Sequence, residues 1–364
     1  KKAFIDGNPE VPSLFVKQLQ SARYNNILMG LAPVRAAAGA FTGLVGKPVT
    51  TFAGSAVDAA TGDLSTFKRS MFLYGGIREN LGRAFQNLAD EWRYAVENSS
   101  LSEARVRKDY VDQTAQDIET MDEMSEVWYQ DGQYGKVAMW NITKGLSYYN
   151  SNAVVRAGIN AMTAIDGFSR SMSASFSARS QAYDELFNAK NGAIDVAEYT
   201  NLQRKLYDQK FDKNGVLKDD VAEYMSREIN LNMDSKTVNA LEDVMRHVPI
   251  AKSIFMFPRT GVNAIQLVQT FSPTGLLGQS IGRGRAIKKA VTQAEIDDVL
   301  VTHGYKPGNN AAFKALKAEY TGREIMGGAV VMGAAFYALN GNLTGSGPQD
   351  MAERKRMIDL GWEP

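Results

Sequence analysis

The chain has 364 residues, with 41 Lys plus Arg against 40 Asp plus Glu, so its formal net charge is +1, and 44% of its residues are hydrophobic. These values exclude an intrinsically disordered tail and a highly basic nucleic-acid coat, and they leave enough chain to bury a sizeable core. Cysteine is absent, which excludes disulfides, cysteine-based metal sites and a thiol nucleophile. The two histidines, His247 and His303, have the neighbours of helix-end residues.

Both ends of the chain bear on its completeness. It begins without an initiator methionine and without the apolar core and cleavage site of a secretory signal. It ends on residues 361–364, where an aromatic residue and a proline stand without a polar tail. We therefore expect the chain to be a piece of a longer polypeptide.

Residues 31–60 form the first distinctive segment, which is rich in Ala, Gly, Thr and Val. Gly39 and Gly43 stand four residues apart and are followed by Gly46, a spacing that lets helix backbones approach closely. The uninterrupted apolar stretch is shorter than the roughly 18 to 20 residues that a bilayer span requires. The pattern leaves two interpretations open, a tightly packed buried helix and a membrane-active segment.

Residues 70–98 carry the strongest helical pattern. Apolar side chains recur there at steps of three to five residues and predict one amphipathic helix. These side chains are Phe72, Ile77, Leu81, Phe85, Leu88, Trp92 and Val96. We expect Phe72, Phe85 and Trp92 to leave an exposed stripe that contacts a neighbouring subunit.

A second long helix is predicted over residues 102–129, with Ser102 as its N-cap. Residues 109–131 contain eight acidic residues and no Lys or Arg. Such a run is typical of a solvated helix face. The alternative is a docking surface for a basic partner.

The middle of the chain continues as helix. Residues 151–188 place apolar side chains on one side, with Arg156, Arg170 and Arg179 interspersed. The same pattern predicts helices over residues 196–209, 217–230, 235–246, 260–269, 292–303 and 310–338. Period-two alternation of β-branched residues is nowhere sustained, which argues against strands.

A local positive field is predicted over residues 250–290, which contain no acidic residue. Its six cations are Lys252, Arg259, Arg283, Arg285, Lys288 and Lys289. Residues 282–289 combine two glycines with four of these cations, which suits the phosphate groups of DNA or of lipid heads. No regular aromatic series accompanies them, so we expect binding that is independent of nucleotide sequence. The alternative is an ionic pairing of this stretch with the acidic helix.

Residues 325–349 form a second segment without a charged residue, and residues 325–339 are its apolar part. We expect Gly327, Gly328 and Gly333 to serve close packing or membrane contact, as in residues 31–60. At about 1.5 Å per residue the apolar part covers about 22 Å of the roughly 30 Å hydrocarbon core. We therefore expect interfacial or hairpin-assisted insertion rather than a lone spanning helix, and burial of both segments until the protein meets lipid.

These elements predict a mainly α fold, an elongated multi-helix assembly with little or no β-sheet. Changes of composition place the domain boundaries. The expected domains are a Gly/Ala-rich segment over residues 1–62, long amphipathic helices over 63–150, a helical core with the basic stretch over 151–320, and a Gly-rich apolar segment with a C-terminal motif over 321–364.

Patterns associated with ligand chemistry are incomplete in this sequence. Phe41 and Pro48 stand where a phosphate-binding loop needs Gly and Ser or Thr. Lys210 and Val221 stand where a calcium loop needs carboxylates. The glycines around Arg283 lack the strand and helix of a dinucleotide site. We therefore expect no enzyme activity, no catalytic residue, no cofactor and no metal site.

Three motifs follow one another in the second half of the chain. The first is AIDGFSR at residues 164–170, which leads into ARSQAY at 178–183. The second runs from PIAK at residues 249–252 through FMFPRTGVN at 255–263 to Ser272 and Pro273. The third runs from LTGSGP at residues 343–348 to GWEP at 361–364. Together they resemble a region of the internal virion or DNA-ejection proteins of tailed phages and of related giant virion polypeptides, which commonly have proline where this chain has Gly261.

The resemblance implies a non-catalytic structural virion protein, stored inside the capsid near the portal and delivered into the host envelope with the genome. It implies a homo-oligomer that contacts other internal virion proteins, the portal, DNA without sequence preference, and the host membrane. Two alternatives stay open. One is a helical accessory or docking region of a giant virion enzyme such as a virion RNA polymerase, and the other is a membrane-active bacterial effector.

Overall fold

The computed structural model describes residues 11–28, 32–75, 77–97, 115–152, 154–189, 194–213, 215–247, 258–340 and 347–361. Of these residues 82% are helical, in 15 α-helices and one 3-10 helix, and none lies in a strand. The mainly α fold predicted from the sequence is confirmed. An isolated antiparallel bridge joins Phe211 to Leu217.

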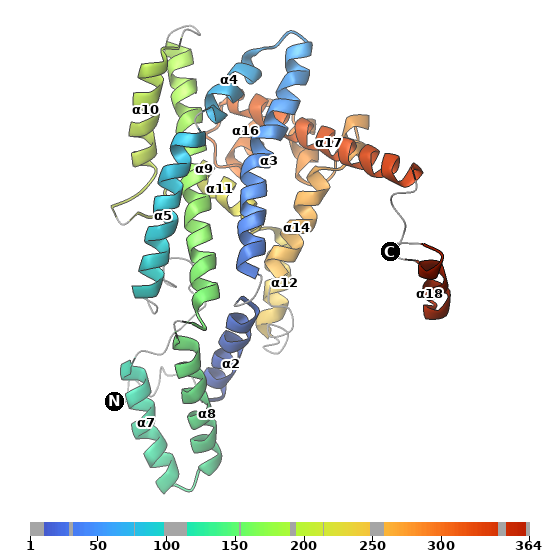
Figure 1. Cartoon of the computed structure of the whole chain (residues 1–364). Helices are drawn as coiled ribbons and strands as arrows, with labels where there is room; N and C mark the ends of the chain where they lie inside the picture. Colours follow the sequence, from blue (N-terminus) through green and yellow to red (C-terminus); the bar gives the residue numbers. More distant parts are fainter. Residues whose placement is uncertain are drawn as a thin grey trace. The chain divides into compact units, whose positions relative to one another are not determined.

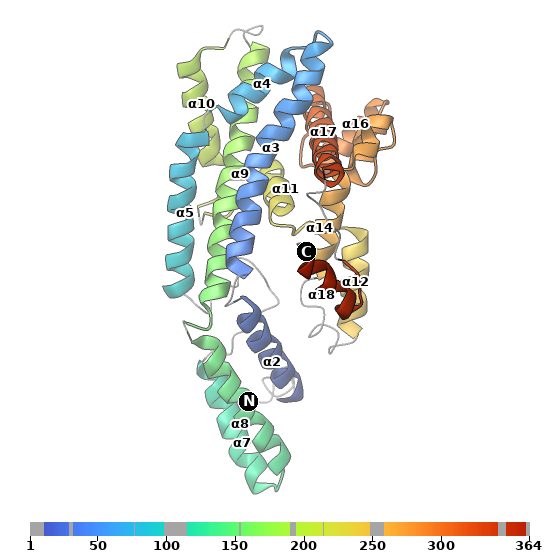
Figure 2. The ribbon, with the colours of Figure 1, turned by 45° about the vertical axis from the view of Figure 1, so that its right-hand side comes forward.

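Figure 1 and Figure 2 show the helices coloured along the chain. They form two compact units that interleave in sequence. Unit 1 comprises residues 1–46, 69–265 and 300–307, and unit 2 comprises residues 47–68, 266–299 and 308–364. Unit 1 contains α2 (Val11–Leu28), α5 (Ile77–Glu97), α7 (Ala115–Gln130), α8 (Tyr134–Ser151), α9 (Ala157–Ala189), α10 (Val196–Gln209), α11 (Asp220–Ile229) and α12 (Lys236–His247). Unit 2 contains η1 (Pro273–Leu277), α15 (Arg283–Lys289), α17 (Asn310–Leu339) and α18 (Met351–Asp359). Shared between them are α3 (Ala32–Ala60), α4 (Ser65–Tyr74), α14 (Pro258–Thr270) and α16 (Gln293–Thr302).

α9 lies at the centre of unit 1, with α5, α10 and α11 packed against it (Figure 1). Its residues 171–180 are all buried. Ala174, Ala178 and Ala182 recur at four-residue steps and leave room for neighbouring helices to approach. The ring of Phe72 from α4 packs edge-on against Tyr199 of α10, with centroids 5.0 Å apart. Burial raises the pKa of the Tyr199 phenol to about 12.

Asp219 is the N-cap of α11 and explains where that helix begins. Its Oδ1 accepts a hydrogen bond from the backbone N–H of Ala222 at 2.9 Å, and its Oδ2 pairs with Lys210 Nζ at 2.6 Å. Burial acts to raise the pKa of this carboxyl, but the hydrogen bonds from Lys210 and Ser177 outweigh it and hold the pKa below its usual value. The predicted start at residue 217 was wrong because Leu217 belongs to the bridge.

The single helix predicted over residues 70–98 is wrong, because α4 ends at Tyr74 and α5 begins at Ile77. The backbone N–H of Gly75 closes the last turn of α4 on the Met71 carbonyl at 2.9 Å. A Cβ on Gly75 would lie 2.7 Å from the Met71 carbonyl oxygen, so glycine suits this position. The break separates Phe72, which packs into the core, from Phe85 and Trp92 of α5.

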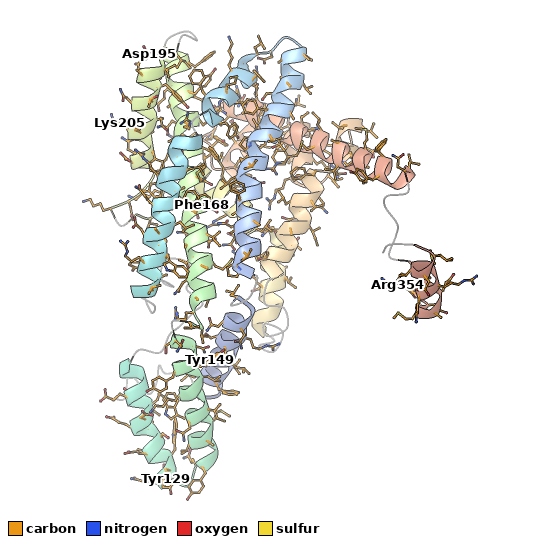
Figure 3. All side chains as sticks on the ribbon, viewed as in Figure 1. Tyr129, Tyr149, Phe168, Asp195, Lys205 and Arg354 are labelled. Carbon is orange, nitrogen blue, oxygen red and sulfur yellow. The ribbon has the colours of Figure 1, made fainter. Side chains whose placement is uncertain are left out.

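α2 and α7 pack against α8 in the same unit. Their small core consists of Leu14, Met121 and Trp140, and the Trp140 indole N–H donates to Asp122 Oδ1 at 2.8 Å. Exposed Tyr129 lies where α7 turns back into α8 (Figure 3). The helix predicted over residues 102–129 is confirmed from residue 115 onward, and Ser102 lies outside the described residues.

Five of the remaining predicted helices correspond closely to elements of the structure. They are α10, α12, α14, α16 and α17, whose bounds differ from the predicted ones by two residues at most. His247 is the last residue of α12, and His303 directly follows α16. Both histidines therefore stand at helix ends, as predicted.

Candidate interaction surfaces

Glu324 of α17 is a buried carboxylate that fixes the loop before α15. It forms an ion pair with Lys288 Nζ and accepts a hydrogen bond from Ser280 Oγ at 2.8 Å. Gly275 of η1 lies so close that a Cβ on it would overlap the Glu324 carboxylate. Lys288 is therefore paired within unit 2, where its positive charge balances the negative charge of the buried Glu324 carboxylate.

The other three cations of α15 differ in their surroundings. Arg283 Nη2 donates to Gln266 Oε1 at 2.9 Å. Arg285 and Lys289 are exposed and stand four residues apart, which places them on one face of the helix. The cationic face that α15 turns to solvent therefore consists of Arg285 and Lys289.

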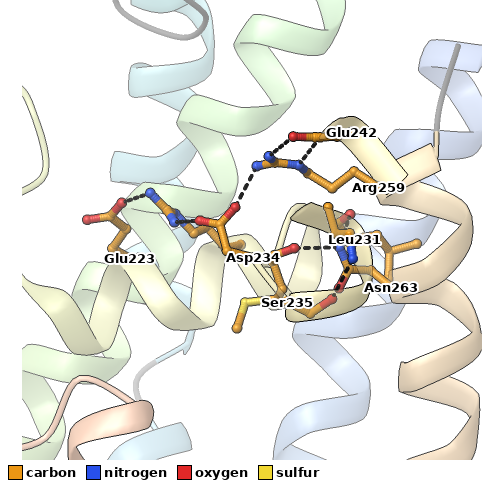
Figure 4. Close-up of polar contacts among 10 residues, drawn as sticks. Glu223, Leu231, Asp234, Ser235, Glu242, Arg259 and Asn263 are labelled. Carbon is orange, nitrogen blue, oxygen red and sulfur yellow. Dashed lines mark hydrogen bonds and ion pairs between the residues drawn. The ribbon is translucent and has the colours of Figure 1, made fainter. Parts of the chain in front are cut away.

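Arg259 belongs to α14 and has acidic partners in unit 1 (Figure 4). Its Nε and Nη2 donate to the two carboxylate oxygens of Glu242 at 3.0 Å, and its Nη1 pairs with Asp234 at 3.0 Å. Lys252 lies outside the described residues. Of the six cations singled out by sequence, the structure thus brings four together on α15.

The acidic helix has a basic partner beside it. Asp122 of α7 forms an ion pair with Lys144 of α8, 30% of whose side chain is exposed. This contact and the hydrogen bond from Trp140 hold the pKa of Asp122 below its usual value against the opposing effect of desolvation. This ion pair between Asp122 and Lys144 is therefore local to the α7–α8 hairpin.

A buried cluster of charges lies where α3 and α17 cross in unit 2. Lys47 Nζ pairs with Glu319 Oε1 at 2.7 Å, and Arg323 Nη2 pairs with the same oxygen at 2.6 Å. The three side chains are only 8%, 7% and 5% exposed. The Arg323 guanidinium also stands 4.6 Å above the centre of the Tyr320 ring. Two cations thus share one carboxylate in a site that water barely reaches.

Two glycines let α3 and α17 approach to backbone contact. A Cβ on Gly54 would overlap the carbonyl of Ala318, and a Cβ on Gly322 would overlap the carbonyl of Thr50. Sequence reasoning missed both residues. A signal was present for Gly54, which lies in the Gly/Ala-rich segment and follows Gly46 by eight residues.

The six glycines that sequence reasoning chose have three kinds of environment. A Cβ on Gly327 would overlap the Phe271 carbonyl. Gly43 and Gly328 face the side chains of Ile229 and Leu276 at 3.4 and 3.5 Å, which is ordinary contact. The remaining three, Gly39, Gly46 and Gly333, face open space.

The last third of α17 is apolar and exposed on every side. Residues 329–339 contain no charged residue, and all eleven are exposed. Phe336 is 66% exposed and Leu339 is 87% exposed. A helix that is apolar all round is normally buried in a protein or in lipid. We name residues 329–339 the α17 end.

Residues 34–49 of α3 also expose apolar side chains. Val34, Phe41, Val45 and Val49 are 43% to 63% exposed. Their steps of seven, four and four residues place them on one face of the helix. We name these four residues the α3 stripe. Ala40 and Leu44 lie outside this face and are buried.

A cavity of about 360 Å³ opens in unit 1 between α5, α9 and the turn after α10. It is lined by Asn87, Asp90, Glu91, Tyr94, Gly167, Arg170, Tyr207, Phe211 and Gly215. Gly167 and Arg170 belong to the first of the three motifs. Carboxylates on α5 and a guanidinium on α9 suit a polar group that carries both signs of charge.

No group of three or more potential metal ligands occurs in the part of the chain that the structure describes. Within the same part, no helix combines the length and the apolar character needed to cross a membrane. Comparisons with protein-family models, curated proteins and solved structures found no match to this chain.

Proposed function

We propose that the chain is a structural, non-catalytic component of a tailed-phage particle, an internal virion protein stored near the portal that helps to deliver the genome across the host envelope. The observation that carries the proposal is the pair of exposed apolar surfaces, the α3 stripe and the α17 end. Exposed apolar surface of this kind marks contact with other proteins or with lipid. The order of the three motifs supports the same role.

The two surfaces fit a protein that changes partners. In the aqueous interior of a particle, neighbouring subunits would cover them. After ejection, burial against lipid would replace burial against protein, and the balance would follow the difference in interaction free energy. At about 1.5 Å per residue the α17 end is about 16 Å long, which suits the membrane interface better than a crossing.

The test is the location of the protein. We expect mass spectrometry of purified particles to detect the chain and cross-linking to join it to the portal or to other internal proteins. After infection, it should be recovered with the host envelope. Absence from the particle would contradict the proposal, and detection only within a larger virion enzyme would favour an accessory region of that enzyme.

The exposed cations of α15 give a second prediction. Reversing Arg285 and Lys289 to glutamate should weaken binding to double-stranded DNA and to anionic vesicles at least about tenfold, because each contact releases a condensed counterion. If these two residues make two phosphate contacts, a plot of the logarithm of the DNA binding constant against the logarithm of the salt concentration should have a slope of about −2. Fluorescence anisotropy at several salt concentrations measures both quantities.

The matched control reverses two exposed cations of α10, Arg204 and Lys205. Figure 3 labels Lys205. Lys210 is unsuitable as a control because it is buried and paired with Asp219. Replacing Lys288 should lower stability rather than binding, since Glu324 holds it. An equal loss at both sites, or an affinity that is insensitive to salt, would refute the assignment to α15.

A further inference from the structure

The α3 stripe has the geometry of a helix-binding seam. From Val34 to Val49 it extends over 15 residue steps, or about 22 Å of helix. Its side chains recur on one face, as in helix pairs whose side chains interlock. The buried face of α3, with Ala40 and Leu44, already packs in its own chain. The stripe therefore remains exposed after α3 has packed within its own chain.

The charge pattern of α3 bears on whether the stripe binds a protein partner or an anionic membrane. Between residues 34 and 57 the only charged residues are Arg35, at the start of the stripe, and Lys47. The Lys47 ammonium group is bound to Glu319 and buried. Lys47 is thus not exposed, and from residue 36 to residue 57, which includes Phe41, Val45 and Val49, the helix offers no exposed cation to lipid phosphate groups, although such cations strengthen binding at an anionic membrane surface. This favours an uncharged apolar helix as the occupant.

The chain itself supplies such a helix. The α17 end is uncharged and exposed, and Gly333 with the alanines at 329, 334, 335 and 338 keeps it slender. α17 also packs on α3 within unit 2, where Gly54 and Gly322 bring the two backbones together. The α3 stripe and the α17 end lie on the same two helices, outside the point where Gly54 and Gly322 bring them into contact.

We propose that the α17 end of one copy lies along the α3 stripe of a second copy. The inference rests on the proposed function, for which it names the surfaces through which the subunits assemble. Because the two surfaces differ, a pair of copies leaves one α3 stripe and one α17 end unused, so the contact can repeat head to tail. Repetition of such a contact gives a closed ring when the rotation permits and a filament when it does not.

Disulfide trapping tests the pairing directly, because the chain has no cysteine of its own. A Phe41→Cys chain and a Phe336→Cys chain of different tagged mass are mixed under mild oxidation. We expect the mixed disulfide between the two chains to dominate. The control replaces the Phe336→Cys chain by a Lys205→Cys chain, since Lys205 is exposed on α10. Equal yield in the control, or only symmetric 41–41 and 336–336 products, would overturn the proposal.

Self-association provides an independent measurement. Sedimentation velocity over a range of concentrations should show the parent chain forming larger species, and Phe41→Glu or Phe336→Glu should raise the dissociation constant at least tenfold. Both side chains are more than half exposed, so the thermal unfolding midpoint of the monomer should stay unchanged. Lys205→Glu is the matched control and should associate like the parent.

Lipid is the competing occupant. A parent chain that stays monomeric but binds vesicles of phosphatidylcholine, with binding lost in Phe41→Glu, would overturn the proposal in favour of lipid. These experiments use the purified chain, so they separate the inference from the proposed function. Association without a place in the particle refutes the function alone, and a place in the particle without this association refutes the inference alone.

Discussion

Replacing Gly322 with alanine is expected to lower the free energy of unfolding by about 2 kcal/mol or more. The new Cβ would overlap the backbone carbonyl of Thr50, so α3 and α17 would have to separate. This cost exceeds the gain of up to about 1 kcal/mol that alanine brings to a helix interior. Gly54→Ala should behave alike, because it meets the Ala318 carbonyl. Urea unfolding followed by circular dichroism measures the change.

Gly333→Ala is the matched control on the same helix. The Cβ of the new alanine would point into open space, so only its higher helix propensity should act. The free energy of unfolding should therefore rise by about 0.5 to 1 kcal/mol. Opposite signs at Gly322 and Gly333 are therefore expected. If the two variants unfold at the same urea concentration, the backbone contact between α3 and α17 is not present in solution.

The second large effect is expected at Glu319. Replacing it with alanine leaves the cations of Lys47 and Arg323 in a buried site without their shared carboxylate, which typically costs about 3 to 5 kcal/mol. Thermal unfolding monitored by circular dichroism should show a correspondingly lower midpoint. Simultaneous replacement of all three charges by apolar residues of similar size should recover most of the loss, because no buried ion then remains.

A solvent-exposed ion pair in unit 2 serves as the control. Lys314 pairs with Asp63 at 3.2 Å, and their side chains are 62% and 42% exposed. Because water screens both charges, Lys314→Ala should cost less than about 1 kcal/mol. Should Glu319→Ala cost no more than Lys314→Ala, the charges at the α3–α17 crossing would have to be hydrated rather than buried.

Helix positions followed from the sequence because side-chain periodicity is a local property. The predicted bounds of α10 match the structure at both ends, and its N-cap, Asp195, is a residue type that favours that position. The break after Tyr74 was missed because apolar residues continue at helical spacing across it, while the local effect of Gly75 is small enough for tertiary contacts to decide.

The partners of individual residues did not follow from the sequence. Lys47 is a charged residue in the Gly/Ala-rich segment, but its partner Glu319 lies 272 residues away. Likewise, glycine spacing indicated a shared helix face but not which glycine meets another helix, so Gly39 was chosen and Gly54 was missed. Arg285 and Lys289 could be selected only after the contacts of Lys288 and Arg283 were known.

The interleaving of the two units has a consequence for biosynthesis. At about 5 to 20 residues per second, a ribosome adds Glu319 about 14 to 54 seconds after Lys47. Most of unit 1 is complete by residue 265, whereas unit 2 needs residues 308–364. We therefore expect unit 1 to fold first, while the later half of α3 waits for α17 to be translated. During that interval the nascent chain presents the Gly54 face of α3 to the cytosol, where a chaperone can bind it before Gly322 arrives.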